Sequence, residues 1–382
     1  MFVTVVGLST VACIGQPSTT HRAALSTPLT SPTSSSSPAW DLDADIGSVM
    51  VLSWRGTVEW STVAPILTRY QVGGVLLFTS NFGGAPADLK SWTDRINALA
   101  SSNCAAHPIL TMLDQEGGDL ANVKASFAPP WPMVMAPRGP DSVRELERVN
   151  GSGLHDAGVG LNLAPVADVR TNPRDGIIGL RSFGSDPSVV APLVGAAVSG
   201  LHDGGVGATV KHFPGLGGAP GDPHVAIPTD PESEAQWSRV QVPAFAAGIA
   251  AGADAVMVTA VYTPGLGSGS TPALFSPAII GRLRNQLGFG GVIVTDSLSM
   301  GGIVQKWPLQ MGAVMALAAG NDMVLLGNGD PSYEMDAMNA VRSAVLAGQL
   351  DRTKLHESAI RVNALRDRWG RPPAACVNSA SA

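Results

Sequence analysis

The chain has 382 residues, of which 45% are apolar or aromatic and only 14% are charged, which excludes a mainly disordered protein. Its 24 basic and 30 acidic residues give a net charge of −6, so it lacks the basic surplus typical of nucleic-acid binders. Three cysteines exclude a disulfide scaffold and leave no Cys-x-x-Cys pair for zinc. The length alone allows two or three domains or one large barrel.

The N-terminal region resembles an export signal. Residues 2–14 are apolar over the length of a signal-peptide core and contain Thr-Val-Ala-Cys, which resembles a bacterial lipobox ending at Cys13. Two features depart from that pattern: Thr10 stands where leucine is usual, and the first basic residue is Arg22. We expect an exported protein of the cell envelope, with a lipid on Cys13 as its membrane contact, or otherwise a secreted protein. The alternative is an uncleaved apolar tail.

The next segment, residues 17–39, is rich in Ser, Thr and Pro and predicts a flexible tether. We therefore expect a signal and tether over residues 1–40, a folded domain over 41–372 and a C-terminal tail over 373–382. Cys104 and Cys376 are the two cysteines outside the export region, and the sequence leaves open whether they pair.

Short segments rich in Val, Ile and Leu recur from Asp45 onward, with amphipathic segments between them. Near-continuous apolar strands that alternate with helices are typical of parallel strands buried on both faces. The expected strands are Ile46–Leu52, Gly74–Phe78, Pro108–Leu113, Gly160–Val166, Ala208–His212, Ala255–Ala260, Gly291–Thr295 and Met323–Leu326.

An internal repeat supports this alternation of helices and strands. Residues 153–160 (GLHDAGVG) recur at 200–207 (GLHDGGVG), and each copy predicts a helix end, a glycine stop and the start of a strand. Eight such units predict a single-domain α/β protein, a (β/α)₈ TIM barrel. The alternative is a doubly wound sheet, which needs a glycine-rich phosphate-binding turn after the first strand. Residues 54–57 (Trp-Arg-Gly-Thr) do not provide that turn.

Charged side chains follow several of the expected strands, and in a barrel these strand ends share one mouth. The candidate residues are Asp114 after strand three, Asp168 and Arg181 after strand four, Lys211 and His212 at the end of strand five, Asp222 and His224 on the next loop, and Asp296 after strand seven. For Asp168 both a substrate contact and a structural hydrogen bond remain open. Asp254 and Asp322 lie at helix-to-strand turns, where we expect them to stabilise the opposite end of the barrel.

This set of residues fits acid/base and covalent catalysis on a sugar. A strand-end carboxylate can attack an anomeric carbon while a second group protonates the leaving oxygen. Asp296 is the expected nucleophile and His224 the expected proton carrier, with Asp222 fixing its tautomer. The expected sugar-binding residues are Asp114, Arg181, Lys211 and His212.

The rival interpretation is a metal-dependent hydrolase with His212, His224 and Asp296 as ligands. Such barrels usually begin with His-x-His after the first strand, where this sequence has residues 51–53, Val-Leu-Ser. We therefore expect neither a metal nor another cofactor.

Several ordered motifs carry a family resemblance. They are Asp114-x-Glu116-Gly117-Gly118, Lys211-His212-Phe213-Pro214-Gly215, Asp222-x-His224 and Val294-Thr295-Asp296-Ser297. From about Asp45 to Trp369 the chain resembles the β-N-acetylglucosaminidases of glycoside hydrolase family 3, most of all single-domain bacterial enzymes that trim cell-wall muropeptides, including actinobacterial lipoproteins. The resemblance implies a metal-free retaining exo-hydrolase that releases terminal GlcNAc from peptidoglycan fragments. Asp296 would be its nucleophile and the Asp222–His224 dyad its acid/base. We expect a monomer acting on a small carbohydrate.

The sequence also departs from that family. Residues 117–122 read Gly-Gly-Asp-Leu-Ala-Asn where relatives have Gly-Gly-Arg-Val-x-Arg, so both arginines are missing. Leu216 replaces a histidine, and Pro223 replaces a serine inside the dyad. Losing one charged hydrogen bond would cost about 1.5–3 kcal/mol of sugar binding. Two alternatives remain: a β-GlcNAc phosphorylase using the same site, and a non-catalytic muropeptide-binding lipoprotein.

Overall fold

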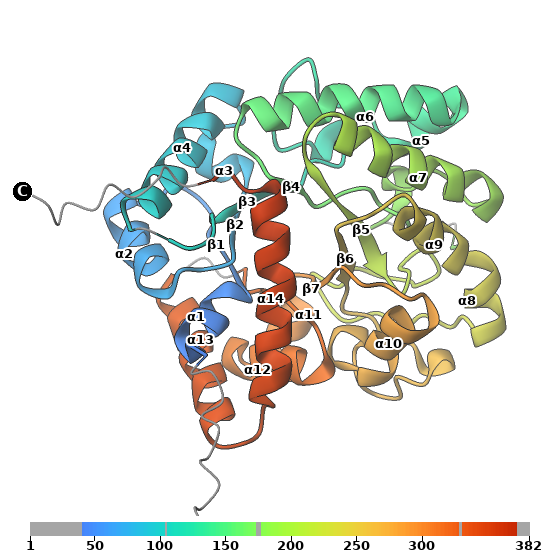
Figure 1. The fold of residues 1–382 in the computed structure, drawn as a ribbon. Helices are drawn as coiled ribbons and strands as arrows, with labels where there is room; N and C mark the ends of the chain where they lie inside the picture. Colours follow the sequence, from blue (N-terminus) through green and yellow to red (C-terminus); the bar gives the residue numbers. More distant parts are fainter. Residues whose placement is uncertain (1–39, 104, 173–176, 328–330, 373–382) are drawn as a thin grey trace, which may run out of the picture. The chain divides into compact units, whose positions relative to one another are not determined.

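Eight parallel strands form a barrel with helices packed around it in the computed structural model (Figure 1). The structure describes residues 40–103, 105–172, 177–327 and 331–372. The strands are β1 (Met50–Ser53), β2 (Gly74–Leu77), β3 (Leu110–Leu113), β4 (Leu161–Asn162), β5 (Gly207–Phe213), β6 (Ala255–Val258), β7 (Val292–Thr295) and β8 (Val324–Leu325). They pair in the order β7-β6-β5-β4-β3-β2-β1-β8, and a parallel bridge between Val294 and Met323 joins the two ends. The predicted (β/α)₈ barrel is confirmed, and the doubly wound alternative is wrong.

The described helices alternate with the strands in the expected way. They are α1 (Leu42–Ser48), α2 (Trp60–Tyr70), α3 (Thr79–Phe82), α4 (Pro86–Ser102), α5 (Pro132–Met135), α6 (Gly139–Asp156), α7 (Pro187–Asp203), α8 (Glu234–Val240), α9 (Val242–Ala250), α10 (Pro277–Gly281), α11 (Gly301–Val304), α12 (Leu309–Ala319), α13 (Pro331–Leu346) and α14 (Arg352–Trp369). None of these described helices has the length and apolar character needed to span a bilayer. The candidate lipid anchor Cys13, the tether and both Cys104 and Cys376 lie outside the described residues.

The internal repeat has the predicted structure. Helix α6 ends just before Gly158, which has φ of +86°, and α7 ends just before Gly205, which has φ of +88°. This left-handed backbone is one that glycine adopts without a Cβ penalty, so both glycines stop a helix and lead into a strand.

The first predicted strand was too long, because its beginning belongs to a helix. The side chain of Asp41 accepts hydrogen bonds from the backbone N–H groups of Asp43 and Ala44, and this cap starts α1, which continues to Ser48. Such a cap satisfies N–H groups that have no partner inside the helix. The apolar residue Ile46 therefore packs from a helix, and the strand begins only at Met50.

The barrel interior and the space under the helices form separate apolar clusters. Alternate strand residues point inward, as Leu110 and Met112 do on β3, while Leu113 packs outward against the helices. Helix α14 adds Leu365 and Trp369 to the inner cluster. The last helix therefore closes one end of the barrel (Figure 1).

Acidic residues at helix-to-strand turns stabilise this closed end through hydrogen bonds and ion pairs. Asp254 accepts hydrogen bonds from Trp369 Nε1 at 2.7 Å and contacts His202 Nε2 at 2.8 Å. Asp322 contacts Arg284 and accepts from Arg361 at 3.0 Å. Both aspartates lie at the end opposite the mouth, where the sequence predicted a stabilising role.

Candidate active site

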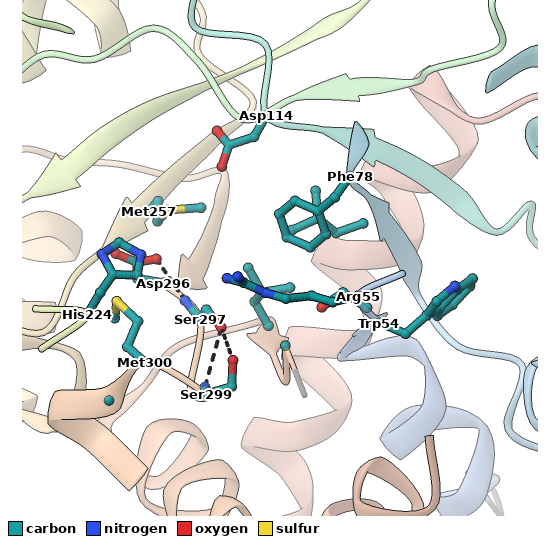
Figure 2. Close-up of a pocket in the computed structure, with 15 residues that line it drawn as sticks. Trp54, Arg55, Phe78, Asp114, His224, Met257, Asp296, Ser297, Ser299 and Met300 are labelled. Atoms are coloured by element: carbon teal, nitrogen blue, oxygen red, sulfur yellow. Dashed lines mark hydrogen bonds between the residues drawn. The ribbon is translucent and has the colours of Figure 1, made fainter. Parts of the chain in front are cut away.

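The mouth of the barrel holds a cavity of about 490 Å³ at the C-terminal ends of the strands (Figure 2). Its walls include Asp114 after β3, His224 on the loop after β5 and Asp296 after β7. A neighbouring hollow of about 440 Å³ shares Asp114 and His224 and continues past Glu116 and Arg181. The chain thus forms one extended, polar depression where the sequence placed its candidate residues.

Asp296 is held by donors on both of its carboxylate oxygens. Its Oδ2 accepts from the hydroxyl of Thr259 at 2.7 Å, and its Oδ1 accepts from the backbone N–H of Ser297 at 2.8 Å. Within the described part of the chain it forms no ion pair. The carboxylate is therefore oriented by neutral donors and remains open to the cavity. Thr259 was not among the residues predicted from the sequence, where its only signal is that it follows β6 at the mouth.

His224 and Asp222 form the predicted dyad. Nδ1 of His224 lies 2.8 Å from Oδ1 of Asp222, which also accepts the backbone N–H of His224 at 2.8 Å. In this contact Nδ1 carries a proton and donates it to the carboxylate, while Nε2 has no hydrogen-bond partner among the described residues. The imidazole is 54% exposed and lines the same cavity as Asp296 (Figure 2).

The loop that carries the dyad is attached through two glycines. The carbonyl of His224 accepts the backbone N–H of Gly301 at 3.1 Å, and the carbonyl of Pro223 accepts that of Gly302 at 3.2 Å. A Cβ on Gly301 would lie 2.3 Å from the carbonyl oxygen of His224. Only glycine permits this approach, so these residues set the position of His224.

Glu116 is the centre of a buried ion cluster behind the cavity. Arg181 donates to both of its oxygens at 2.7 and 2.8 Å, and Lys211 Nζ lies 2.5 Å from Oε1 and also contacts Asp114. Burial alone would raise the pKa of Glu116, but the charges of Arg181 and Lys211 hold this pKa far below its usual range. Against the effect of burial, the two acids likewise raise the pKa of Lys211. The contact with Lys211 orients Asp114 toward the cavity.

His212 and Asp168 continue this network into the interior. His212 Nδ1 lies 2.7 Å from Asp168 Oδ2, and its Nε2 lies 3.0 Å from Arg181 Nη2. Asp168 is fully buried and also accepts the backbone N–H of Leu216 at 2.6 Å. Of its two possible roles, the structure supports the structural hydrogen bond.

The four predicted sugar-binding residues thus occupy different depths. Asp114 lines both hollows and Arg181 lines the second, whereas Lys211 and His212 are 1% and 5% exposed and lie behind them. Glu116 lies within a sequence motif whose pattern indicated no role for it, and in the structure it holds Arg181 and Lys211.

The departures from the family motif lie beside the second hollow. Asn122, in place of an arginine, donates to the carbonyl of Asp114 at 2.5 Å and accepts from the backbone N–H of Thr79 at 2.9 Å. It therefore ties two mouth loops together. Asp119, in place of the other arginine, lines the hollow.

The metal-site alternative is not supported by the donor set. Both ring nitrogens of His212 already face protein partners, Asp168 and Arg181. Across the described ranges, no group of three or more His, Cys, Asp or Glu side chains is arranged to hold a metal ion.

The fold and this mouth match one family of sugar-cleaving enzymes. The model of the glycosyl hydrolase family 3 N terminal domain matches residues 42–365, so the chain belongs to glycosyl hydrolase family 3 and is a glycoside hydrolase.

The names of individual relatives describe a more specific activity than the family does. The beta-hexosaminidase LpqI of Mycobacterium bovis is 30% identical over 321 residues, which are 81% of this chain and 80% of the relative. A solved family 3 beta-N-acetylglucosaminidase from Paenibacillus superposes with a TM-score of 0.83 at 31% identity, covering 90% of this chain. This chain spans only 65% of that protein. A beta-N-acetylhexosaminidase from Beutenbergia cavernae has a TM-score of 0.78 at 32% identity, with 86% and 98% of the two chains covered.

Proposed function

We propose that the protein is a retaining exo-β-N-acetylglucosaminidase that releases terminal GlcNAc from peptidoglycan fragments. The observation that carries the proposal is that Asp296 and the Asp222–His224 dyad line one cavity at the barrel mouth. The similar proteins are named as a beta-hexosaminidase and a beta-N-acetylglucosaminidase, which supports GlcNAc as the sugar that is released. The muropeptide aglycone rests on the sequence resemblance.

The reaction proceeds in two displacements at this cavity. In the first, an oxygen of Asp296 attacks the anomeric carbon while His224, protonated at Nε2, gives that proton to the departing glycosidic oxygen. The contact with Asp222 stabilises the imidazolium before the transfer. In the second, neutral His224 takes a proton from water, whose oxygen attacks the anomeric carbon and releases Asp296. Atoms and charges balance without a metal or cofactor.

The remaining mouth residues bind the sugar. Asp114 and Arg181 face the hollows and hydrogen-bond the hydroxyl groups, while Lys211 and His212 hold these two side chains from behind. That the enzyme acts as a monomer stays a prediction from the sequence.

We also propose that the enzyme works in the cell envelope. The support is the apolar segment at residues 2–14 and the lipobox-like motif that ends at Cys13. The lipid on Cys13 would be its membrane attachment.

Trapping the intermediate tests the chemistry. A fluorinated N-acetylglucosaminyl fluoride, which reacts quickly and hydrolyses slowly, should inactivate the enzyme and label the peptide that contains Asp296, as read by mass spectrometry. A label on another carboxylate would disprove the assigned nucleophile. Sugar binding without labelling or turnover would indicate the binding-only alternative, and GlcNAc 1-phosphate formed in phosphate buffer would indicate a phosphorylase.

Gly301→Ala should slow catalysis by displacing His224. The new methyl group would press on the carbonyl of His224 and shift the dyad by a few tenths of an ångström or more, so we expect kcat to fall at least about tenfold. Steady-state kinetics on aryl N-acetyl-β-glucosaminides measures this. The loss should shrink for dinitrophenyl leaving groups, which need less protonation.

Gly290→Ala is the matched control, because a Cβ there meets no atom within 4 Å. Its kcat should equal that of the wild type. Equal losses in the Gly301 variant for good and poor leaving groups would show that Gly301 does not act through the acid.

A further inference from the structure

Arg55 extends into the cavity from a loop that the sequence gave no role. The loop follows β1. Trp54, the residue before Arg55, is 1% exposed and packs on Trp92 with ring centroids 5.8 Å apart. Asn81 Nδ2 donates to the carbonyls of Trp54 and Gly56, both at 2.9 Å. The backbone is therefore held on both sides of Arg55, and its side chain is presented from a fixed position.

The guanidinium of Arg55 points toward the reacting groups. Figure 2 shows it passing between Phe78 and Ser297 in the direction of His224 and Asp296. Its carbon lies 5.8 Å from the centroid of the Phe78 ring, which places an apolar face on one side of the charge.

The charge of Arg55 has no counter-ion among the residues that the structure describes. Arg181 and Lys211 are bound to Glu116, and Lys124 beside the second hollow donates to the carbonyl of Asp119, whereas Arg55 forms no ion pair with any carboxylate in the described ranges. A guanidinium presents paired donors in a plane that match the two oxygens of a carboxylate or phosphate. Arg55 thus gives the cavity an oxyanion-binding group that is not engaged by any carboxylate of the described residues.

An anionic substrate needs such a group in this cavity. Asp114 lines it but is paired with Lys211, whereas Asp296 forms no ion pair within the described residues and repels an anion entering the same space. Arg55 lines the same cavity and carries a permanent positive charge that offsets this repulsion, whereas His224 loses its charge during the proposed reaction. A neutral substrate does not need this compensation.

We propose that Arg55 determines specificity by binding an anionic group, a carboxylate or a phosphate, carried by the substrate. This inference rests on the proposed glucosaminidase function and adds a charge requirement to it. No covalent step involves Arg55.

The test compares two substrates that differ in charge alone. These are GlcNAc-β-1,4-MurNAc, which carries a lactyl carboxylate, and its methyl ester, which is neutral. For Arg55→Gln we expect kcat/KM to fall at least about tenfold further on the acid than on the ester, which corresponds to the loss of one charge-assisted hydrogen bond. Arg69→Gln is the matched control, because Arg69 also lies over an aromatic ring, that of Tyr70 at 5.2 Å, and does not line the cavity.

Inorganic phosphate distinguishes the source of the anion. If phosphate is the group bound, it should inhibit the wild type competitively and the Arg55→Gln variant at least about tenfold more weakly, with no selective loss on the acid. Equal losses on acid and ester together with unchanged phosphate inhibition would overturn the proposal.

If the wild type cleaves neither disaccharide, the glucosaminidase function fails, and binding decides the role of Arg55. Calorimetric titration should then show weaker binding of the acid, and not of the ester, to Arg55→Gln. Identical affinities for both proteins, without a difference in phosphate binding, would overturn the specificity role.

Discussion

Asp296→Asn will reduce kcat on an aryl N-acetyl-β-glucosaminide by about 10⁴-fold or more, because removing a covalent nucleophile leaves only binding and acid assistance. The amide keeps the size of the side chain: its oxygen can accept the backbone N–H of Ser297, and the hydroxyl of Thr259 can turn to accept from its nitrogen. We therefore expect the variant to fold and to bind the sugar. Stopped assays over many hours, with the thermal unfolding temperature measured in parallel, check both statements.

Asp156→Asn is the control, since this exposed aspartate ends α6 and does not line the cavity. Its kcat should match that of the wild type. An Asp296→Asn enzyme that retains more than about a tenth of wild-type kcat would refute the nucleophile assignment.

Lys211→Met will lower the free energy of unfolding by about 3 kcal/mol or more. The substitution removes a buried cation and leaves Glu116 and Asp114 facing each other with Arg181 as the remaining counter-charge. Breaking a buried pair by removing one partner typically costs about 3–5 kcal/mol. Urea unfolding followed by circular dichroism measures the change, and kcat/KM should fall as well because Asp114 loses its orientation.

Lys90→Met provides the matched comparison at the surface. Lys90 pairs with Asp94 one helical turn away, and both side chains are 49% exposed, so its loss should cost less than about 1 kcal/mol. Similar costs for the two variants would show that the Glu116 cluster does not stabilise the fold.

The buried cluster also predicts a pH dependence. Because the pKa of Glu116 is lowered in the folded state, the stability it confers is present above its unfolded pKa of about 4.3 and is lost as the pH falls below that value. Lys211→Met removes one of the cations that lower this pKa. Acid unfolding of the variant should therefore begin at a higher pH than that of the wild type.

The barrel and the mouth residues were predictable because their signals are local. A run of apolar residues that ends in a charged one marks the mouth end of a buried strand, and this pattern located Asp114, Lys211 and Asp296. The glycine stops at Gly158 and Gly205 likewise marked where helices return to strands.

The burial of the site residues and their ion-pair partners were not predictable, because both depend on contacts between loops that are distant in the sequence. The sequence could not show that Lys211 is buried behind Asp114, or that Glu116 joins it to Arg181. Arg55 follows a strand in the same way as the other candidates, yet the sequence around it suggested only the absence of a phosphate loop. Its position depends on Asn81, which lies on the next βα unit.

The closure of the barrel has a consequence for how the chain reaches its active form. The first strand, β1, completes its pairing only with the last one, β8, and α1 packs on α14. The cavity wall likewise joins Arg55, after β1, to Gly327, after β8. Contacts between chain ends carry the largest loop-closure entropy, so we expect them to form late in folding. Ribosome-bound or truncated chains that lack the final helix should therefore remain without hydrolytic activity even when most of the strands are present.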